Sequence, residues 1–200
     1  GRSTDEVLVG DWDGDGIDTL AVRRGNMYYF SNSISDPNAD VTVVSYGRST
    51  DEVLVGDWDG DGVDTLAVRR DGNTYYFSNS VSDPDAGVTE VSYGRTDDEV
   101  LVGDWDGDGI DTLAVRRDGN IYYFSNSVNN PNAEVTRVSY GRTADLVLVG
   151  DWDGDGIDTL AVRRNGNIYY FSNSISNPDT DVTVVSYGRA ADAVYVGTWA

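Results

Sequence analysis

The stretch that decides the fold is Gly10-Asp11-Trp12-Asp13-Gly14-Asp15-Gly16-Ile17-Asp18-Thr19-Leu20-Ala21-Val22-Arg23-Arg24. It returns almost unchanged from Gly56, from Gly103 and from Gly150, and a shortened copy stands at residues 197–200. The successive spacings are 46, 47, 47 and 47 residues. A period of this length indicates a repeat architecture, because one such unit is too short to bury a core of its own and must pack against its neighbours.

Each repeat contains four short segments of strand character. In the first repeat an apolar run at residues 6–10 precedes the acidic loop, and residues 19–23 follow it. Residues 27–31 and 41–46 complete the set, rich in aromatic and β-branched side chains. Turn sequences such as Asp71-Gly72-Asn73 separate the second and third segments. The sequence therefore predicts an all-β chain in which each repeat is a four-stranded antiparallel meander.

The predicted architecture is a β-propeller. The strands are apolar on both faces, and four-stranded units of this length that pack face to face are propeller blades. We expect a single repeat domain over residues 1–200, with repeats at about 5–50, 51–97, 98–144 and 145–191 and a closing strand at 192–200. A stacked β-solenoid is the alternative, although its coils are usually shorter and it would need distinct caps.

The first strand occurs once more than any other strand. Its five copies are residues 7–12, 53–58, 100–105, 147–152 and 194–199, whereas each other strand has four copies. We expect the fifth copy to close the ring by pairing with early strands, displacing or flanking residues 7–12. An unpaired strand edge is open to association, so donation of this strand to another molecule, as a strand-exchanged homo-oligomer, is the alternative to a monomer.

Composition excludes several functions. The net charge is −21, which opposes binding to nucleic acid and favours divalent cations as partners. The chain has no His and no Cys, so it lacks Ser-His and Cys-His catalytic machinery, and we expect no enzyme. Carboxylate pairs that could serve a glycosidase are the same ones that a metal would use. No apolar run is long enough to span a membrane, so no membrane insertion is expected.

The acidic loop has the residue pattern of a calcium site. Asp11, Asp13 and Asp15 place carboxylates on alternate residues, while Gly14 and Gly16 permit a tight turn. Ca²⁺ takes about six to eight oxygen ligands, and the carbonyl of the seventh loop residue commonly supplies one. A metal-free acidic turn is the plain alternative. Mg²⁺ is less suited, because it keeps its waters and resists an all-protein cage. We expect about four Ca²⁺ ions, one for each complete repeat.

The motif Val-x-Val-Gly-Asp-Trp-Asp-Gly-Asp-Gly-x-Asp-Thr-Leu-Ala-Val resembles the FG-GAP/VCBS type of calcium-binding propeller repeat, the blade of integrin α-subunits. Its Gly-Asp-Trp and Leu-Ala-Val-Arg-Arg version is similar to tandem repeats of secreted actinobacterial proteins. This resemblance covers the whole chain. It implies an extracellular or cell-surface protein whose loop between the first and second strands of each blade binds calcium.

One departure from the family pattern concerns the end of the loop. The family has a carboxylate at the ninth loop position, whereas this chain has Asp18 at position eight and Thr19 at position nine. Either Asp18 reaches the ion directly, or it supports other ligands and Thr19 or water takes its place. The predicted metal ligands are Asp11, Asp13, Asp15, Ile17 and Asp18; Asp57, Asp59, Asp61, Val63 and Asp64; Asp104, Asp106, Asp108, Ile110 and Asp111; and Asp151, Asp153, Asp155, Ile157 and Asp158.

Two further recurring features have a structural and a functional interpretation. The loop tryptophans, of which Trp12 is the first, are expected to pack between neighbouring sheets rather than to stack on a sugar. The Arg23-Arg24 pair and its copies are expected to pair with acidic residues of the Asp51 type rather than to bind an anionic ligand.

The predicted role is that of a binding or adhesion module for a glycan, a cell-wall polymer or a protein. A structural spacer, or an engineered array of one repeat with no ligand besides calcium, is the alternative. The loops that vary most between copies, residues 33–40, 80–87, 127–134 and 174–181, are the expected place for a ligand, yet they carry plain Asn, Asp, Ser and Pro.

Overall fold

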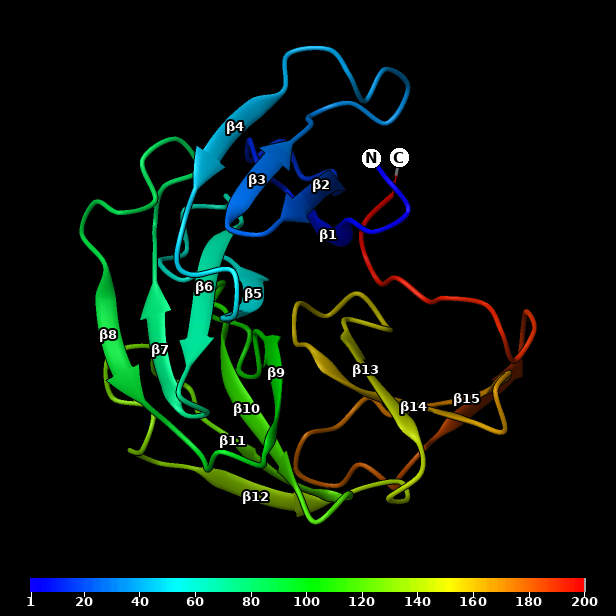
Figure 1. The fold of residues 1–200 in the computed structure, drawn as a ribbon. Coiled ribbons are helices and arrows are strands. Elements are labelled where there is room, and N and C mark those ends of the chain that lie inside the picture. Colours follow the sequence, from blue (N-terminus) through cyan, green and yellow to red (C-terminus); the bar gives the residue numbers. More distant parts are fainter. Residues whose placement is uncertain (200) are drawn as a thin grey trace. The chain divides into compact units, whose positions relative to one another are not determined.

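The computed structural model describes residues 1–199, which form sixteen β-strands and no helix (Figure 1). The first strands of the repeats are β1 (Glu6–Gly10), β5 (Glu52–Gly56), β9 (Glu99–Gly103) and β13 (Leu146–Gly150). The second strands are β2 (Thr19–Arg24), β6 (Thr65–Arg70), β10 (Thr112–Arg117) and β14 (Thr159–Arg164). The third strands are β3 (Met27–Phe30), β7 (Thr74–Phe77), β11 (Ile121–Phe124) and β15 (Ile168–Phe171). The fourth strands are β4 (Thr42–Ser45), β8 (Thr89–Ser92), β12 (Thr136–Ser139) and β16 (Thr183–Ser186).

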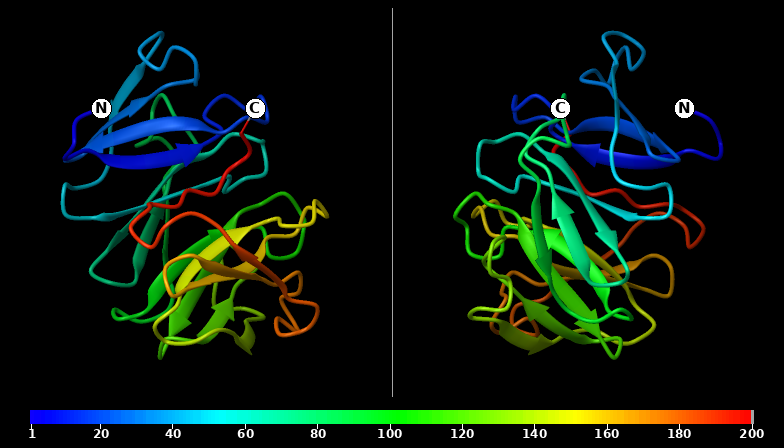
Figure 2. Two further views of the ribbon diagram at one scale, coloured as in Figure 1. Left: turned by 90° about the vertical axis from the view of Figure 1, so that its right-hand side faces the viewer. Right: turned by 60° about the vertical axis from the view of Figure 1, so that its left-hand side comes forward.

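Consecutive strands pair antiparallel and only within their own repeat, which gives four separate four-stranded sheets. We call them blades 1 to 4 in chain order. In blade 1 the register runs from Gly10 opposite Thr19 to Glu6 opposite Arg23, so the acidic loop joins the first two strands. Figure 2 shows the twist that strands of L-residues impose on each sheet. The predicted all-β class and the meander of propeller-type blades are confirmed.

The turns between second and third strands depend on residues that tolerate positive φ. Asp71 and Gly72 have φ of 52° and 85°, the left-handed pair that a tight hairpin turn needs. In blade 1 the turn is one residue shorter, and Gly25 alone takes the positive φ of 65°. This one-residue difference explains why the first repeat spans 46 residues rather than 47.

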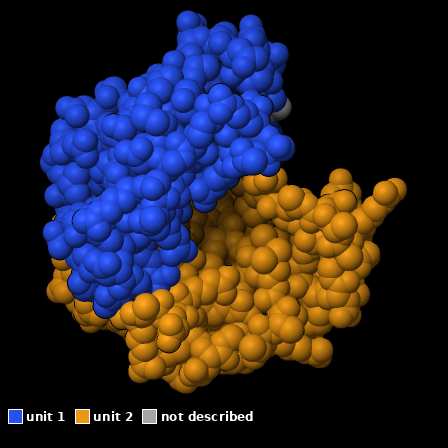
Figure 3. Space-filling model, in the orientation of Figure 1, with its two compact units in different colours: residues 1–93, 197–200 blue, residues 94–196 orange. Residues whose placement is uncertain are grey.

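The described chain forms two compact units (Figure 3). Unit 1 contains residues 1–93 and 197–199, and therefore blades 1 and 2. Unit 2 contains residues 94–196, and therefore blades 3 and 4. The single repeat domain over residues 1–200 stays a prediction.

Within unit 1, the core is the interface between the two blades. Trp12, Tyr28, Phe30 and Tyr46 form an aromatic face on blade 1, and this face packs against Leu66 and Val68 of blade 2. The Trp12 ring meets Phe30 edge-on, with ring centroids 4.7 Å apart. Burial of large rings stabilises such an interface by its apolar area and its ring geometry. Trp12 therefore packs between sheets, as predicted.

Unit 2 repeats this interface. The aromatic face of blade 3 packs against Leu160 and Val162 of blade 4. The residues of that aromatic face are Trp105, Tyr122, Phe124 and Tyr140. One rule of packing thus governs both units: the aromatic face of one blade is covered by the second strand of the next.

The fifth copy of the first strand differs from expectation. Among the described residues, 192–199 join no strand ladder, and β1 pairs with β2 without being displaced. In every complete repeat the first strand pairs with the second strand of the same repeat. Within residues 1–199, the fifth copy lies beside no second strand of its own repeat, so no ladder of hydrogen bonds defines it as a strand.

Candidate metal centre

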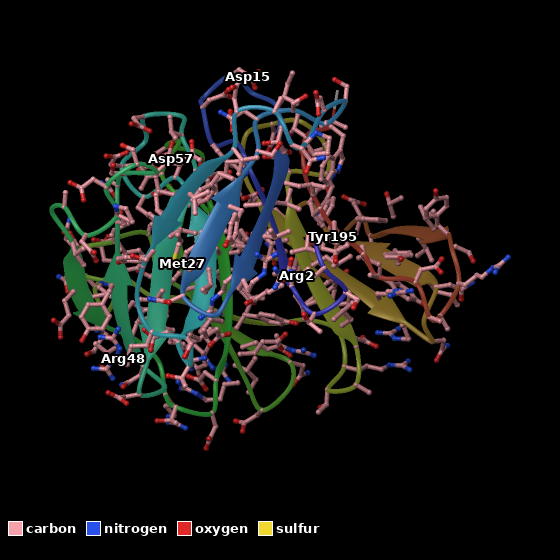
Figure 4. All side chains as sticks on the ribbon, turned by 45° about the horizontal axis from the view of Figure 1, so that its top comes forward. Arg2, Asp15, Met27, Arg48, Asp57 and Tyr195 are labelled. Carbon is pink, nitrogen blue, oxygen red and sulfur yellow. The ribbon has the colours of Figure 1, made fainter. Side chains whose placement is uncertain are left out.

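Three carboxylates converge in each acidic loop. Asp11, Asp13 and Asp15 each offer one carboxylate oxygen, and these oxygens lie within 4.8 Å of one another. The corresponding groups in the other repeats are Asp57, Asp59 and Asp61; Asp104, Asp106 and Asp108; and Asp151, Asp153 and Asp155. In unit 1 the labelled Asp15 and Asp57 lie toward the same end of the two blades, and Arg48 lies toward the other (Figure 4). The structure therefore brings together twelve of the twenty predicted ligands, three in each repeat.

The loop winds around the carboxylate of its first residue. Asp11 Oδ1 accepts from the backbone N–H groups of Gly14 and Asp15 at 2.8 and 3.2 Å, and Oδ2 accepts from Gly16 at 2.7 Å. Gly14 and Gly16 have φ of 75° and 83°, which turns these N–H groups inward at little steric cost. The other three loops make the same contacts from Asp57, Asp104 and Asp151. The first carboxylate is thus held in place before any ion binds, and its Oδ2, which accepts only one of these bonds, has a further lone pair.

The electrostatics of the loop favour a cation. Burial and then the neighbouring charges of Asp61 and Asp57 raise the pKa of Asp59. Burial and then Asp108 do the same for the pKa of Asp106. Carboxylates that repel one another in this way are stabilised by an ion of opposite sign. Three hard oxygens on a tight loop are suited to Ca²⁺ or another hard divalent cation.

An asparagine that the sequence analysis did not select supports the second aspartate of the triad. Asn79 donates from Nδ2 to Asp59 Oδ2 at 2.7 Å. The equivalent contacts join Asn126 to Asp106 at 2.8 Å and Asn173 to Asp153 at 2.9 Å. The sequence contains a signal for this asparagine, because Phe-Ser-Asn-Ser stands at the end of the third strand in every copy. This amide fixes one oxygen of the second carboxylate.

At position seven, the backbone N–H forms a hydrogen bond with the third aspartate of the triad. The N–H of Ile17 donates to Asp15 Oδ1 at 3.0 Å, and the same bond recurs for Val63, Ile110 and Ile157 at 2.9 Å. This bond continues the inward winding of the loop by one residue. Ligation through the carbonyl of position seven stays a prediction.

The aspartate at position eight forms hydrogen bonds with the neighbouring blade rather than with its own loop. Asp64 Oδ2 accepts from the backbone N–H of Asp11 at 2.8 Å, and the Asp64 N–H donates to the Asp11 carbonyl at 2.7 Å. In unit 2, Asp158 makes the same pair of bonds with Asp104, at 3.1 and 2.7 Å. We call this reciprocal pair the clasp. It ties the start of one loop to the end of the loop in the next blade.

The clasp carboxylates are largely withdrawn from water. Burial raises the pKa of Asp64 to about 7 and that of Asp158 to about 6, against the partial compensation of the N–H bond each accepts. The position-eight residues Asp18, Asp64, Asp111 and Asp158 stand outside the three-carboxylate groups. Whether position eight also ligates an ion stays a prediction, but its contacts in the described chain are those of a structural residue.

The shortened fifth copy completes a clasp for the first repeat. The N–H of Asp18 donates to the Thr198 carbonyl at 2.9 Å, and the Thr198 N–H donates back to the Asp18 carboxylate. Thr198 occupies the sequence position of Asp11 in this copy. Only its backbone is used, which explains why the loop aspartate is dispensable there.

Position nine points into its own blade. The Thr65 hydroxyl donates to the Ser78 carbonyl at 2.6 Å, and Thr112 and Thr159 do the same to Ser125 and Ser172 at 2.7 Å. These threonines are buried. The hydroxyl thus ties the second strand to the end of the third, a use independent of metal.

The recurring arginines pair with acidic residues, as predicted. Arg164 contacts both carboxylate oxygens of Asp145, at 3.0 and 2.6 Å. The same forked pair joins Arg24 to Asp5, Arg70 to Asp51 and Arg117 to Asp98. The bond from Arg24 lowers the pKa of Asp5 to about 2. These guanidinium groups are therefore engaged at the start of each blade rather than free for a ligand.

Comparison with protein-family models, with curated proteins and with solved structures gave no match. Over residues 1–199, no helix has the length and apolar character to cross a membrane.

Proposed function

We propose that this chain is a non-catalytic calcium-binding module, with one Ca²⁺ in the loop of each complete repeat. The observation that carries the proposal is the convergence of three carboxylates within 4.8 Å in all four loops. Calcium is favoured over magnesium because a protein loop with several carboxylates and carbonyls offers many oxygens at flexible distances. The resemblance of the loop motif to FG-GAP/VCBS repeats supports the same ion and an extracellular or cell-surface setting.

A thermal unfolding experiment tests the ion. Binding to the folded state alone stabilises by about 1.4 kcal/mol per site at tenfold excess over the dissociation constant. We expect chelator to lower the melting temperature and added Ca²⁺ to restore it, with Mg²⁺ much less effective at equal concentration. A melting temperature that ignores both chelator and calcium would refute the proposal.

The biological role that we propose is attachment of a larger assembly to a glycan, a cell-wall polymer or a protein. The support for it is the resemblance and the acidic character of the chain, whose net charge is −21. A glycan array and binding to isolated cell walls, each with and without Ca²⁺, test this role. Calcium-dependent retention on one ligand class supports it, and no retention on any class contradicts it.

A structural spacer is the second candidate, and one observation favours it. The recurring residues that could have met a ligand are used internally: Trp12 and Trp105 are buried in blade interfaces, and Arg164 is paired with Asp145. Apart from one Ile or Val in each, the variable loops carry mostly small or short polar side chains and Pro. A chain that binds calcium in the thermal test yet binds nothing on the arrays would be a spacer.

A further inference from the structure

In the described chain, the aromatic face of blade 4 is more exposed than that of blade 3. The equivalent face of blade 3 is closed: Tyr140 is 4% exposed, and its hydroxyl donates to the Tyr170 carbonyl of blade 4 at 3.0 Å. Tyr187 stands at the same position of blade 4 and is 77% exposed. Just before it, on β16, Val185 is 42% exposed, whereas Val138 at the same position of blade 3 is half-buried. Within unit 2, the end of this face is thus buried in blade 3 and open in blade 4.

The interface between blades 3 and 4 shows which side chains cover such an aromatic face. There, Leu160 and Val162 from the second strand of blade 4 are 2% and 1% exposed against the aromatic face. Because blade 4 repeats the sequence of that face, its cover should also be a strand that reads Thr-Leu-Ala-Val-Arg-Arg. A generic apolar surface would not supply the alternate small and branched side chains that fill this interface.

Residues 189–196 lie against blade 4 where the first strand of a following blade would lie. Arg163 donates to the carbonyls of Arg189 and Asp192 at 2.8 and 3.0 Å. In blade 3, Arg116 donates in the same way to the carbonyls of Arg142 and Asp145, both at 3.0 Å.

The side chains agree with this placement. A Cβ on Gly150 would lie 3.0 Å from Val196 Cγ1, and a Cβ on Gly103 would lie 2.9 Å from Val149 Cγ1. Val196 therefore sits on blade 4 as Val149 sits on blade 3. Residues 189–196 have the location of a first strand whose second, third and fourth strands are absent from the described chain.

The ion pairs differ between blade 4 and the fifth copy in the same way. In blade 4, Asp145 receives the forked guanidinium of Arg164 from the second strand. Asp192 is the equivalent residue of the fifth copy; it is exposed and accepts the backbone N–H of Arg189 at 2.8 Å. An occupant that ends its strand in Arg-Arg would bring a guanidinium to Asp192.

We propose that blade 4, together with residues 189–196, binds a three-stranded segment with the chemistry of the second to fourth strands of these repeats. The incoming second strand pairs with the edge of residues 193–196, lays its Leu and Val on the aromatic face, and donates its last Arg to Asp192. This site is separate from the calcium loops. It makes the chain an acceptor for repeat-type strands, a mode of recognition by strand addition.

The test uses a peptide with the sequence of residues 158–187, titrated into the intact chain and followed by calorimetry and native mass spectrometry. We expect saturable one-to-one binding. Leu160→Asp in the peptide should abolish binding, because it places a charge in the apolar interface. Arg164→Gln in the peptide should weaken binding by about tenfold, the scale of a charge-assisted hydrogen bond.

The chain itself provides the matched variant. Asp192→Asn should weaken binding of the unaltered peptide by the same factor, and should have no further effect on the Arg164→Gln peptide, since both changes break one pair. Additive effects of the two changes would overturn the proposed pairing. Absence of binding to the unaltered peptide at about millimolar concentration would overturn the site.

Because the free peptide could associate with itself, a second experiment tethers it to the chain. The same segment is joined to the end of the full chain by a flexible Gly/Ser linker, and chemical nitration of Tyr187 is measured. We expect nitration of Tyr187 to fall to the level of buried Tyr140, and the Leu160→Asp tether to leave it unchanged. Unchanged nitration with both tethers contradicts the proposal.

A second copy of the whole chain is the competing occupant. Its blade 1 offers Leu20, 42% exposed, at the position where Leu66 of blade 2 is 2% exposed. If the chain forms a dimer that Leu20→Asp dissolves and that the peptide does not displace, the face belongs to a second copy and the proposal fails.

Discussion

Asp59 and Asp64 belong to the same loop and have the same side chain, yet the structure uses them in different ways. Asp59 is exposed and points its carboxylate toward two others, with one oxygen held by Asn79. Asp64 is withdrawn from water and accepts the N–H of Asp11 in the preceding blade. A solvent-facing carboxylate among like charges is arranged for a cation, whereas a withdrawn one with a backbone donor is arranged for structure.

The difference teaches how the loop serves two purposes. Its first five residues bring three carboxylates together, and its last residues form hydrogen bonds with the neighbouring blade. Because the clasp begins at Asp11, the residue whose carboxylate organises the triad, metal binding and blade pairing share one backbone segment. Substitutions at each of these contacts separate the two uses.

The largest effect is expected when the triad is broken in every repeat at once. Replacing Asp13, Asp59, Asp106 and Asp153 with Ala should remove the stabilisation by calcium, about 5–6 kcal/mol for four sites at tenfold excess over the dissociation constant. Denaturant unfolding with and without Ca²⁺ measures it. Replacing the loop residues Asp36, Asp83 and Asp179 with Asn is the control and should leave the calcium effect intact.

The clasp should respond differently to two substitutions at one position. Asp64→Ala leaves the Asp11 N–H without an acceptor and should cost about 1–3 kcal/mol. Asp64→Asn keeps an acceptor oxygen and removes a charge that is costly to bury, so stability should be retained or raised at pH 8 without metal. Calcium affinity should not change with Asn; a large loss of affinity would show that Asp64 is a ligand.

The pH dependence of this pair has a definite sign. The pKa of Asp64 is raised to about 7 in the folded chain, so its ionised form is disfavoured there. In metal-free protein, Asp64 therefore costs stability progressively as pH rises from its unfolded pKa of about 4 through about 7. Asp64→Asn should remove that part of the pH profile, and an unchanged profile would contradict the assignment.

The arginine pairs should produce a smaller effect of opposite sign. The bond from Arg164 lowers the pKa of Asp145, and the bond from Arg24 lowers that of Asp5 to about 2. Their stabilisation is present above the unfolded pKa of about 4 and is lost as pH falls through the folded pKa. Arg164→Gln should cost about 1 kcal/mol at neutral pH and flatten the acid limb of an unfolding titration. Arg189→Gln, whose side chain is exposed, is the control.

The smallest effect is expected at the supporting amide. Asn79→Ala frees one oxygen of Asp59 and should weaken calcium binding in that loop by about two- to threefold, the scale of a weak hydrogen bond. The free energy of unfolding without metal should hardly change. A calcium titration of a chain whose other three loops carry the Asp→Ala changes isolates this site.

The fold could be predicted because its determinants are local. The period, the Asp71-Gly72 turn and the triad spacing all lie within one repeat, and the structure has them where the sequence predicts them. The clasp could not be predicted, since Asp64 and Asp11 lie 53 residues apart and nothing in the loop motif says which blade accepts the carboxylate. Residues 194–199 were expected as a strand from their similarity to the other copies, but a strand also requires a partner.

The central claim is that each loop triad holds one calcium ion, and a calorimetric titration tests it most directly. For the intact chain we expect four ions, with dissociation constants of about 10⁻⁴–10⁻³ M. Asp13→Ala should reduce the number to three, and Asp64→Asn should leave it at four. Absence of calcium-dependent heat in the intact chain, or a stoichiometry that Asp13→Ala does not change, would contradict the account.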